Sequence, residues 1–423
     1  MSFLKQTLFV VALGVLPVAP VAAQTFEQML EMALHHNPAL SAGYRDWQTR
    51  VQSADGAGYL PDPMIAVDYF TTPIETRTGP QEQRLMLEQK LPWFGTRDLQ
   101  QQEKKQQAEA SRWQWQNQKL DLQRQLGLLY GELYLWGQSV RIARDNVNLL
   151  QEMEAIVRAR YRVANASQPD LIRIQVEVGK AQDRLTSLES QVPSLSARLE
   201  MLLGKTSNLQ PGEWPQTLPE HYVLPDEAKL TSSLTAHPAL SQWQEMARAA
   251  ESSASLAEKR YGPDITLRYG HLFTGDALNA DMADSGKDPE YIGIAFNLPL
   301  WSHQYDANRM AAISRSQAAQ AQQEMTALQL RSALQQGFFQ LTDGERKQQL
   351  YQNDLIPKTE EALQAQLRAY QTGEIAFRDL LDTEKQLLDL QLMSAQAEQQ
   401  RWNAYHQILA ASGQPYPGMK KDQ

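Results

Sequence analysis

The chain contains 423 residues, of which 42% are hydrophobic and 21% are charged, and it has no cysteine. The absence of thiols excludes a disulfide framework, a thiolate metal site, a cysteine nucleophile and a cysteine-linked lipid anchor. The formal net charge of −9 argues against a general nucleic-acid binder, which needs a basic surface. After the N-terminus no apolar run approaches the roughly 20 residues of a membrane-spanning helix, which excludes a polytopic helical membrane protein.

Residues 1–23 have the pattern of a secretory signal peptide. A basic residue precedes the apolar stretch 8–16, and the small residues at 21–23 predict cleavage before Gln24. Pro17 and Pro20 disfavour the other interpretation, a buried N-terminal helix. The mature chain is therefore expected outside the cytoplasm, and its lack of thiols suits an oxidising compartment such as the periplasm.

The mature sequence contains two copies of one pattern. Asn37-Pro38-Ala39-Leu40-Ser41 recurs as His237-Pro238-Ala239-Leu240-Ser241, 200 positions later. Other motifs recur in the same order, at 59–62 and 261–264, 91–93 and 298–301, 160–171 and 369–380, and 202–204 and 411–413. We interpret the chain as two structural repeats, about 24–225 and 226–423, joined by a proline-rich linker.

Each repeat is expected to hold a helix, two short strands and a long helical hairpin, the hairpins spanning about 95–205 and 302–413. Residues 96–162 contain no proline, and their apolar positions alternate spacings of four and three, which predicts a coiled-coil seam. These positions are Leu122, Leu126, Leu129, Leu133, Trp136, Val140, Ala143, Val147 and Leu150. In the second repeat the corresponding heptad positions are Leu381, Leu388, Ala395, Trp402 and Leu409. A helix of about 65 residues would be roughly 100 Å long, so an elongated molecule is predicted.

Four segments have the period of a β-strand, at about 63–71, 83–91, 263–273 and 290–299. Each has one apolar and one mixed face and about the length of an outer-membrane strand, 9–11 residues. The polar connections 71–83 and 274–289 are expected to be long outward loops. Two interpretations fit these strands: membrane strands, or two soluble hairpins that pack one face on a core.

Four strands cannot close a barrel, which needs about eight. An open sheet with apolar positions facing lipid would leave unpaired edges in hydrocarbon. If the strands span a membrane, several copies must therefore combine them, most simply in a closed ring with cyclic symmetry.

The ordered set of motifs resembles the TolC family of outer-membrane efflux proteins over essentially the whole mature chain. The Pro-Ala-Leu openings at 38–40 and 238–240 and the strand-to-helix turns at 91–93 and 298–301 carry this resemblance. It implies a mainly α protein with a membrane β-barrel contribution. Three chains would form a homotrimer in the lipid of the outer membrane, with four strands from each chain in one twelve-stranded barrel. The long helices would form a hollow periplasmic cylinder that is neither an enzyme nor a cofactor-binding protein. A periplasmic adaptor (membrane fusion protein) and an inner-membrane pump of the RND type would dock at the helical tip.

The last helical hairpin gives the best residue-level match to that family. The resemblance implies that Asp379 and Asp382 are the acids of the tunnel gate. It assigns Tyr161, Asp170, Tyr370 and Gly373 to the network at the hairpin tips and to adaptor docking. The sequence departs from TolC at two places. Glu374-Ile375 stands where TolC has a Thr-Arg pair, and Ala164 replaces the glycine of the first hairpin.

The role of Asp379 and Asp382 can also be interpreted independently of the family resemblance. Asp379 and Asp382 are i and i+3, hence on one face of a helix. In a trimer each would be present three times, and such a ring of carboxylates attracts cations and repels anions. The competing explanation is that both acids only stabilise a helix N-terminus through the helix dipole.

The function expected from these features is a passive exit duct of a tripartite export system. The turn at 91–95, Leu-Pro-Trp-Phe-Gly, looks closest to the heavy-metal efflux branch, and a drug- or protein-exporting branch stays open. The rival is a secreted or periplasmic, soluble coiled-coil adaptor or scaffold. No catalytic motif is present.

Two further groups of residues have open interpretations. His271 with Asp276, Asp281, Met282 and Asp284 could bind a cation in an external loop, although their spacing lacks the pattern of a calcium loop. Trp93, Phe94 and Trp301 lie where strands give way to helices, as an interfacial aromatic belt or as packing at a bend.

Overall fold

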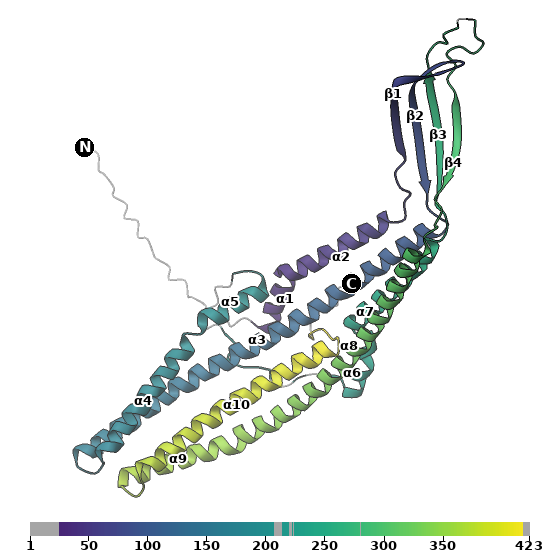
Figure 1. Ribbon diagram of the computed structural model, residues 1–423. Helices are drawn as coiled ribbons and strands as arrows, with labels where there is room; N and C mark the ends of the chain where they lie inside the picture. The colour runs from purple at the N-terminus through teal and green to yellow at the C-terminus, as the bar shows by residue number, and fades with distance from the viewer. Residues whose placement is uncertain (1–24, 207–213, 220–221, 223, 280, 418–423) are drawn as a thin grey trace, which may run out of the picture.

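The computed structural model describes residues 25–206, 214–219, 222, 224–279 and 281–417, so the signal-peptide segment 1–23 lies outside the described residues. Figure 1 shows an elongated molecule. A β-sheet forms one end, two helical hairpins turn at the opposite end, and short helices lie beside the middle. The elongation predicted from the long proline-free segment is confirmed.

The helices follow the same order in both repeats, which confirms the duplication. The first repeat contains α1 (Phe26–His36), α2 (Pro38–Gly56), α3 (Thr96–Arg162), α4 (Gln168–Glu189) and α5 (Val192–Leu203). The second contains α6 (Glu227–Ser233), the 3₁₀ turn η2 (Leu234–Ala236), α7 (Pro238–Lys259), α8 (Ser302–Leu350), the π-helical turn η3 (Tyr351–Leu355), α9 (Ile356–Thr372) and α10 (Phe377–Ala411). Among the described residues, no helix has both the length and the apolar character of a transmembrane helix.

The repeats differ in the continuity of their long helices. α3 runs for 67 residues without interruption. Its counterpart consists of α8, η3 and α9, and Pro357 occupies the first turn of α9. Because proline has no backbone N–H to donate to the carbonyl of the preceding turn, a wider π turn at this point is expected.

The repeated Pro-Ala-Leu motif begins α2 and α7 with the same tertiary contact. The Asn37 side chain caps α2 and donates a 2.9 Å hydrogen bond to the carbonyl of Leu202. His237 caps α7 through Nδ1, and its Nε2 lies 3.0 Å from the carbonyl of Ala410. Because a carbonyl only accepts, Nε2 carries the proton and Nδ1 accepts the helix N–H. Each cap thus fastens the start of one helix to the end of its repeat's hairpin.

The predicted seam of α3 is confirmed, since every one of its apolar positions is buried. In α10 the prediction holds for Leu381, Ala395, Trp402 and Leu409. It is wrong for Leu388, which is only partly buried because Leu387 and Leu390 take the core positions there.

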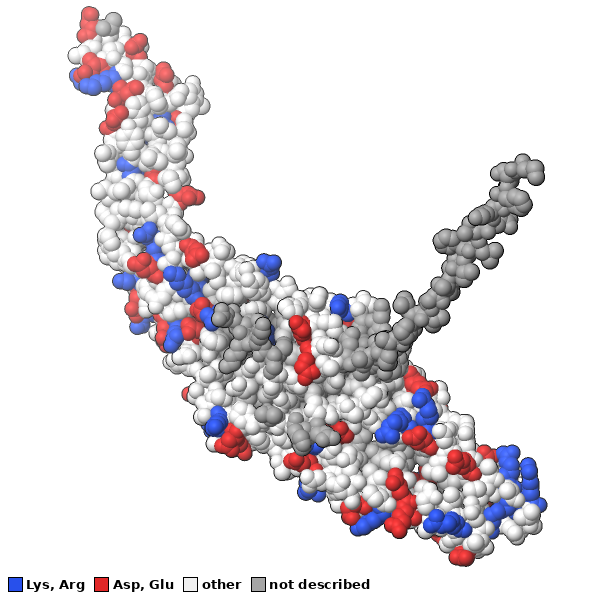
Figure 2. Space-filling view, turned by 180° about the vertical axis from the view of Figure 1, so that it is seen from behind, with Lys and Arg blue, Asp and Glu red and all other residues white. Residues whose placement is uncertain are grey.

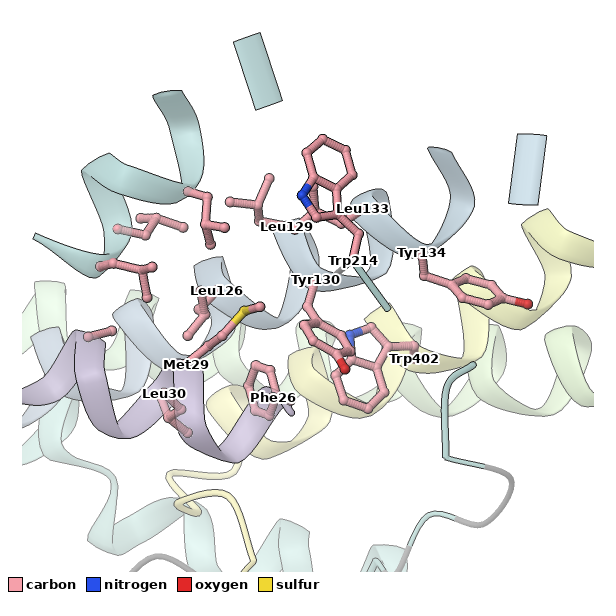
Figure 3. Packing of buried hydrophobic residues seen from close by; sticks show 14 of the residues in the cluster. Phe26, Met29, Leu30, Leu126, Leu129, Tyr130, Leu133, Tyr134, Trp214 and Trp402 are labelled. Atoms are coloured by element: carbon pink, nitrogen blue, oxygen red, sulfur yellow. The ribbon is translucent and has the colours of Figure 1, made fainter. Parts of the chain in front are cut away.

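The largest core joins α1, α3, α5 and α10 beside the middle of the molecule. Figure 3 shows Phe26, Met29 and Leu30 of α1 against α3, with Trp402 of α10 completing the cluster. α10 approaches α3 closely because Gly127 and Gly131 have no side chain. A Cβ at Gly127 would overlap the His406 ring, and one at Gly131 would lie 2.8 Å from Trp402. The indole of Trp402 donates a 2.6 Å hydrogen bond to the carbonyl of Gly127.

The strands form one antiparallel sheet in the order β1–β2–β3–β4, in which the strands are β1 (Met64–Thr76), β2 (Gly79–Leu91), β3 (Ile265–Thr274) and β4 (Glu290–Phe296). The β2–β3 pairing joins the strands of the two repeats in one sheet. The expectation of a long loop at 71–83 is wrong. β1 continues to Thr76 and β2 begins at Gly79, with a register shift between Tyr69 and Ile74.

The two faces of the sheet have opposite character. The register places Ile65, Leu87, Tyr269 and Ile292 in one row across all four strands. This face is uncovered, since Ile65 is 68% and Ile292 is 84% exposed. The opposite face holds ion pairs between neighbouring strands, Asp68 with Arg84 and Glu88 with Arg268. Figure 2 shows that charged residues are sparse over the middle of the strands and frequent on the helices.

Candidate functional site

The two hairpin turns lie at the end of the molecule opposite the sheet (Figure 1). In the first turn Ser167 caps α4, and its hydroxyl donates a 2.7 Å hydrogen bond to the Asp170 carboxylate. Ala164 adopts a left-handed conformation with φ of 58°. An L-residue there costs about 1–2 kcal/mol, so the turn keeps a glycine-like geometry without glycine.

The second turn is built by Gly373, which ends α9 with φ of 90°. The N–H groups of Gly373 and Glu374 both bond back to the carbonyl of Ala369, as is usual for a glycine C-cap. Tyr370 is buried one turn earlier, and its ring centroid lies 5.6 Å from that of Phe377 in α10. Gly373 therefore shapes the turn, and Tyr370 packs inside it.

Arg160 connects the two hairpins, a role that was not predicted from the sequence. Its guanidinium carbon lies 4.5 Å from the ring centroid of Tyr370. Its Nη2 donates a 2.9 Å hydrogen bond to the carbonyl of Asn165, in the first turn. The only sequence signal was its place at the start of a repeated motif, and a cation–π contact between distant segments leaves no spacing pattern.

A cavity of about 540 Å³ lies between the two turns. Its lining includes Arg160, Asp170, Tyr370 and Arg378. The Tyr370 hydroxyl and the Arg160 Nη1 atom are both buried without a hydrogen-bond partner among the described residues. Burial raises the pKa of Tyr370, the Arg160 cation opposes that rise and the Asp170 carboxylate adds to it. Two hydrogen-bond donors beside this cavity, one from each hairpin, are therefore unused.

The predicted site residues separate into two groups. Asp170, Tyr370 and Gly373 gather around Arg160. Asp379 and Asp382 lie on the exposed surface of the first turns of α10 and do not line this cavity. Asp382 Oδ2 is 3.8 Å from Nε of Arg378, a loose ion pair within the helix. Tyr161 is 42% exposed and also lies outside the cavity lining.

The described residues contain no cluster of three or more acids and histidines able to hold a metal ion. His271 lies near Asp288 and Glu290, at 3.4 and 3.2 Å, and forms no ion pair with the three aspartates proposed from the sequence in the described part of the chain. Each ring nitrogen therefore faces its own carboxylate, because β3 and β4 place these side chains at the mouth of the loop.

The aromatic residues at the strand-to-helix turns also differ in their surroundings. Trp93 packs on Gly262, where a Cβ would lie 2.5 Å from the indole ring. Phe94 and Trp301 are 73% and 79% exposed. Packing at a bend therefore describes Trp93, whereas Phe94 and Trp301 project from the junction.

Comparison with known proteins shows which proteins share this sequence pattern and this architecture. Residues 230–414 match the family model of the outer membrane efflux protein. The outer membrane efflux protein BepC of Brucella suis biovar 1 (strain 1330) is 23% identical over 290 residues, which cover 67% of this chain. The match spans 61% of that relative, hence less than two thirds of its length.

Solved structures share the fold over nearly the whole chain. VceC from Vibrio cholerae has a TM-score of 0.75 at 17% identity and covers 92% of this chain and 96% of its own. The channel OprN has a TM-score of 0.76 at 17% identity, covering 92% and 90%. CusC has a TM-score of 0.74 at 14% identity, covering 92% of both chains.

The sheet, the long helices and the paired hairpins define a TolC-like outer-membrane channel fold. The second repeat matches the outer membrane efflux protein family by sequence, and the whole chain shares its fold with solved outer-membrane proteins of this architecture. The resemblance expected from the sequence is confirmed. The proteins to which the chain is similar include outer-membrane efflux proteins and outer-membrane channels.

Proposed function

We propose that the protein is the outer-membrane exit duct of a tripartite efflux system and that it performs no chemistry of its own. The observation that carries this proposal is the four-stranded sheet. One of its faces is apolar and uncovered, the other carries ion pairs, and neither edge has a strand partner among the described residues. An apolar face turned to lipid and a polar face turned to a lumen is the arrangement of outer-membrane strands.

The edges of this sheet call for a closed ring of several copies, and the resemblance to the TolC family implies that the ring is a homotrimer. β1 and β4 expose unpaired backbone groups, which hydrocarbon does not tolerate. Pairing β4 of one copy with β1 of the next closes a ring, and three copies supply twelve strands. Large apolar residues lie beside both edges: Tyr59 precedes β1 and is 77% exposed, and Trp301 follows β4 and is 79% exposed. A head-to-tail contact would cover both.

The hairpin tips are the proposed docking site of the periplasmic adaptor. The adaptor would link the duct to an inner-membrane pump, which we propose to be of the RND type. Adaptor binding would separate the hairpins and break the contact between Arg160 and Tyr370. The two unused donors beside the cavity support this role, because a closed tip that leaves donors unsatisfied is easier to open.

The cargo is proposed to be cationic. Asp379 and Asp382 are exposed near the tip, and threefold symmetry would bring up to six carboxylates around one axis. Heavy-metal cations are the cargo that the resemblance implies, and cationic drugs are the alternative. Transport assays with a divalent metal and with an organic cation separate them.

The duct is tested by two substitutions on β4. Ile294→Lys puts a charge on the apolar face, where membrane insertion then costs about 2–4 kcal/mol near the bilayer midplane. Ala295→Lys, the matched control, puts the same charge on the opposite face. We expect heat-modifiable trimers in outer-membrane detergent extracts for the wild type and Ala295→Lys, and a strong loss for Ile294→Lys. Recovery of the wild type as an aqueous monomer would instead support the soluble scaffold.

A further inference from the structure

His406 is completely buried in a cage of aromatic rings. Its ring centroid lies 4.4 Å from that of Trp402, 4.6 Å from that of Phe26 and 5.6 Å from that of Tyr416, with which it is stacked in parallel. Both ring nitrogens lack a hydrogen-bond partner among the described residues. A neutral imidazole has one donor and one acceptor, so both of these groups are buried unsatisfied.

Four separate segments meet at this ring. Phe26 begins α1, the His406 ring lies on the bare backbone of Gly127 in α3, His406 belongs to α10, and Tyr416 lies in the C-terminal segment. The backbone N–H of Tyr416 donates to Gln123 at 2.8 Å. The hydroxyl of Tyr416 donates to Glu27 at 2.9 Å, which joins residues 389 positions apart. The cage therefore fastens both ends of the described chain to the long helices.

The cage can hold only the neutral imidazole, because a buried charge without a partner is far more costly than a buried neutral group. Burial lowers the pKa of His406 to about 3. In an opened cage the ring would regain its ordinary value of 6.5. The group is a base whose pKa is lowered by folding, so its contribution to stability is complete above pH 6.5. That contribution is lost as the pH falls towards 3, because only the opened form takes up the proton.

The other titratable groups of the cage do not change charge in this range. Burial raises the pKa of Tyr130 in α3 and of Tyr405 in α10 to about 12, and also raises the pKa of Tyr416, so all three stay neutral. Burial also raises the pKa of Glu27 in α1, but hydrogen bonds from its own backbone, Tyr416 and Thr25 outweigh it, and the net pKa lies below 4.5.

One positive charge lies in the next layer. The Arg401 guanidinium of α10 is 5.3 Å from the ring centroid of Tyr222, which in turn packs against Trp402 and Tyr405. This guanidinium keeps its charge at acidic and neutral pH alike. Between pH 6.5 and 4.5, His406 is therefore the only group of the cage expected to titrate.

We propose that His406 is an acid-sensitive lock that holds α1 and the C-terminal segment on α3 and α10. Protonation in a transiently opened cage keeps these two terminal segments detached, whereas the long helices and the sheet stay folded. The sheet and the hairpin tips play no part in this lock, so it does not depend on the proposed transport function.

The lock is tested by amide hydrogen exchange on the full chain in detergent, from pH 7.5 to 4.5, after correction for the intrinsic pH dependence of exchange. Each pH unit below 6.5 should lower the protection of α1 about tenfold, which amounts to about 100-fold at pH 4.5. Peptides of β2 and β3 should keep their protection. Flat protection of α1 over this range would overturn the proposal.

Three variants test whether His406 causes the acid-induced loss of protection in α1. His406→Phe keeps an aromatic ring and removes the titrating group, so the acid-induced loss should disappear. Glu27→Gln should retain the loss. His237→Asn removes the other buried histidine bonded to α10 and copies the cap that Asn37 provides in the first repeat, so it should also retain the loss. An unchanged loss in a folded His406→Phe would contradict the lock.

A measurement on the wild type covers the case in which His406→Phe does not fold. Exchange of the imidazole C2 hydrogen, followed by mass spectrometry, reports the pKa of each histidine. We expect a pKa below about 4 for His406 in the folded protein. A pKa near 6.5 would refute the proposal without any substitution.

Discussion

The guanidinium of Arg160, near the end of α3, lies 4.5 Å from the ring centroid of Tyr370, near the end of α9. This single contact spans both hairpins of one chain at the tip of the helices. Ile375 stands where TolC has an arginine. In this chain an arginine reaches the tyrosine from the other hairpin.

Arg160→Met keeps the apolar stem of the side chain and removes its charge. We expect a loss of about 0.5–1 kcal/mol of contact energy, which corresponds to a two- to fivefold rise in the open probability of the duct in planar bilayers. Arg158→Met is the matched control, because Arg158 pairs with Glu154 on its own helix. Equal effects of both substitutions would assign the change to net charge at the tip.

Asp379→Asn with Asp382→Asn removes two charges per chain near the tip. If these acids ring the constriction, the permeability ratio of cations to anions should fall several-fold, as should block by divalent cations. The measurement is the reversal potential in a salt gradient across a planar bilayer. Glu374→Gln removes an acid from the preceding turn and should change selectivity less. Unchanged selectivity in the double variant would limit both acids to a role at the helix N-terminus.

Gly127→Ala tests the close approach of α10 to α3. The added Cβ would overlap the His406 ring, and such overpacking costs about 1–3 kcal/mol. The thermal midpoint of the helical region should fall. Gly179→Ala in α4 is the control, because no atom outside its own helix backbone lies within 4 Å of the new Cβ. Alanine there should stabilise the helix by about 0.5–1 kcal/mol. A rise of similar size in both variants would show that helix propensity, and not packing, decides the outcome.

The parts of the fold that repeat along the chain could be predicted from the sequence. The seam of α3 follows from apolar spacing in a proline-free segment, and the duplication follows from recurring motifs. The extent of β1 could not be predicted, because Pro73 and Pro80 favour a loop. β1 is an edge strand, and an edge strand tolerates a proline whose missing N–H would face away from the sheet.

The candidate site was only partly accessible to the same reasoning. Tyr370 and Gly373 were placed at the hairpin tip by the resemblance to the TolC family, and not by a pattern in the residues themselves. Arg160 and the cage around His406 could not be placed, because both depend on segments that meet only in the folded chain. The pairing of β2 with β3, which unites the repeats, has the same cause.

The π turn at η3 has a mechanical consequence. α3 is an unbroken rod from the sheet to the tip, whereas the second long helix has a joint at Tyr351–Leu355. The π turn replaces the regular α-helical hydrogen bonds by i→i+5 bonds, so bending of the helix is expected to concentrate there. In a ring of three copies, straight α3 helices would alternate with second long helices that contain the joint. An aperture at the tip would then widen by bending of the three jointed helices, while the three α3 helices keep the cylinder rigid.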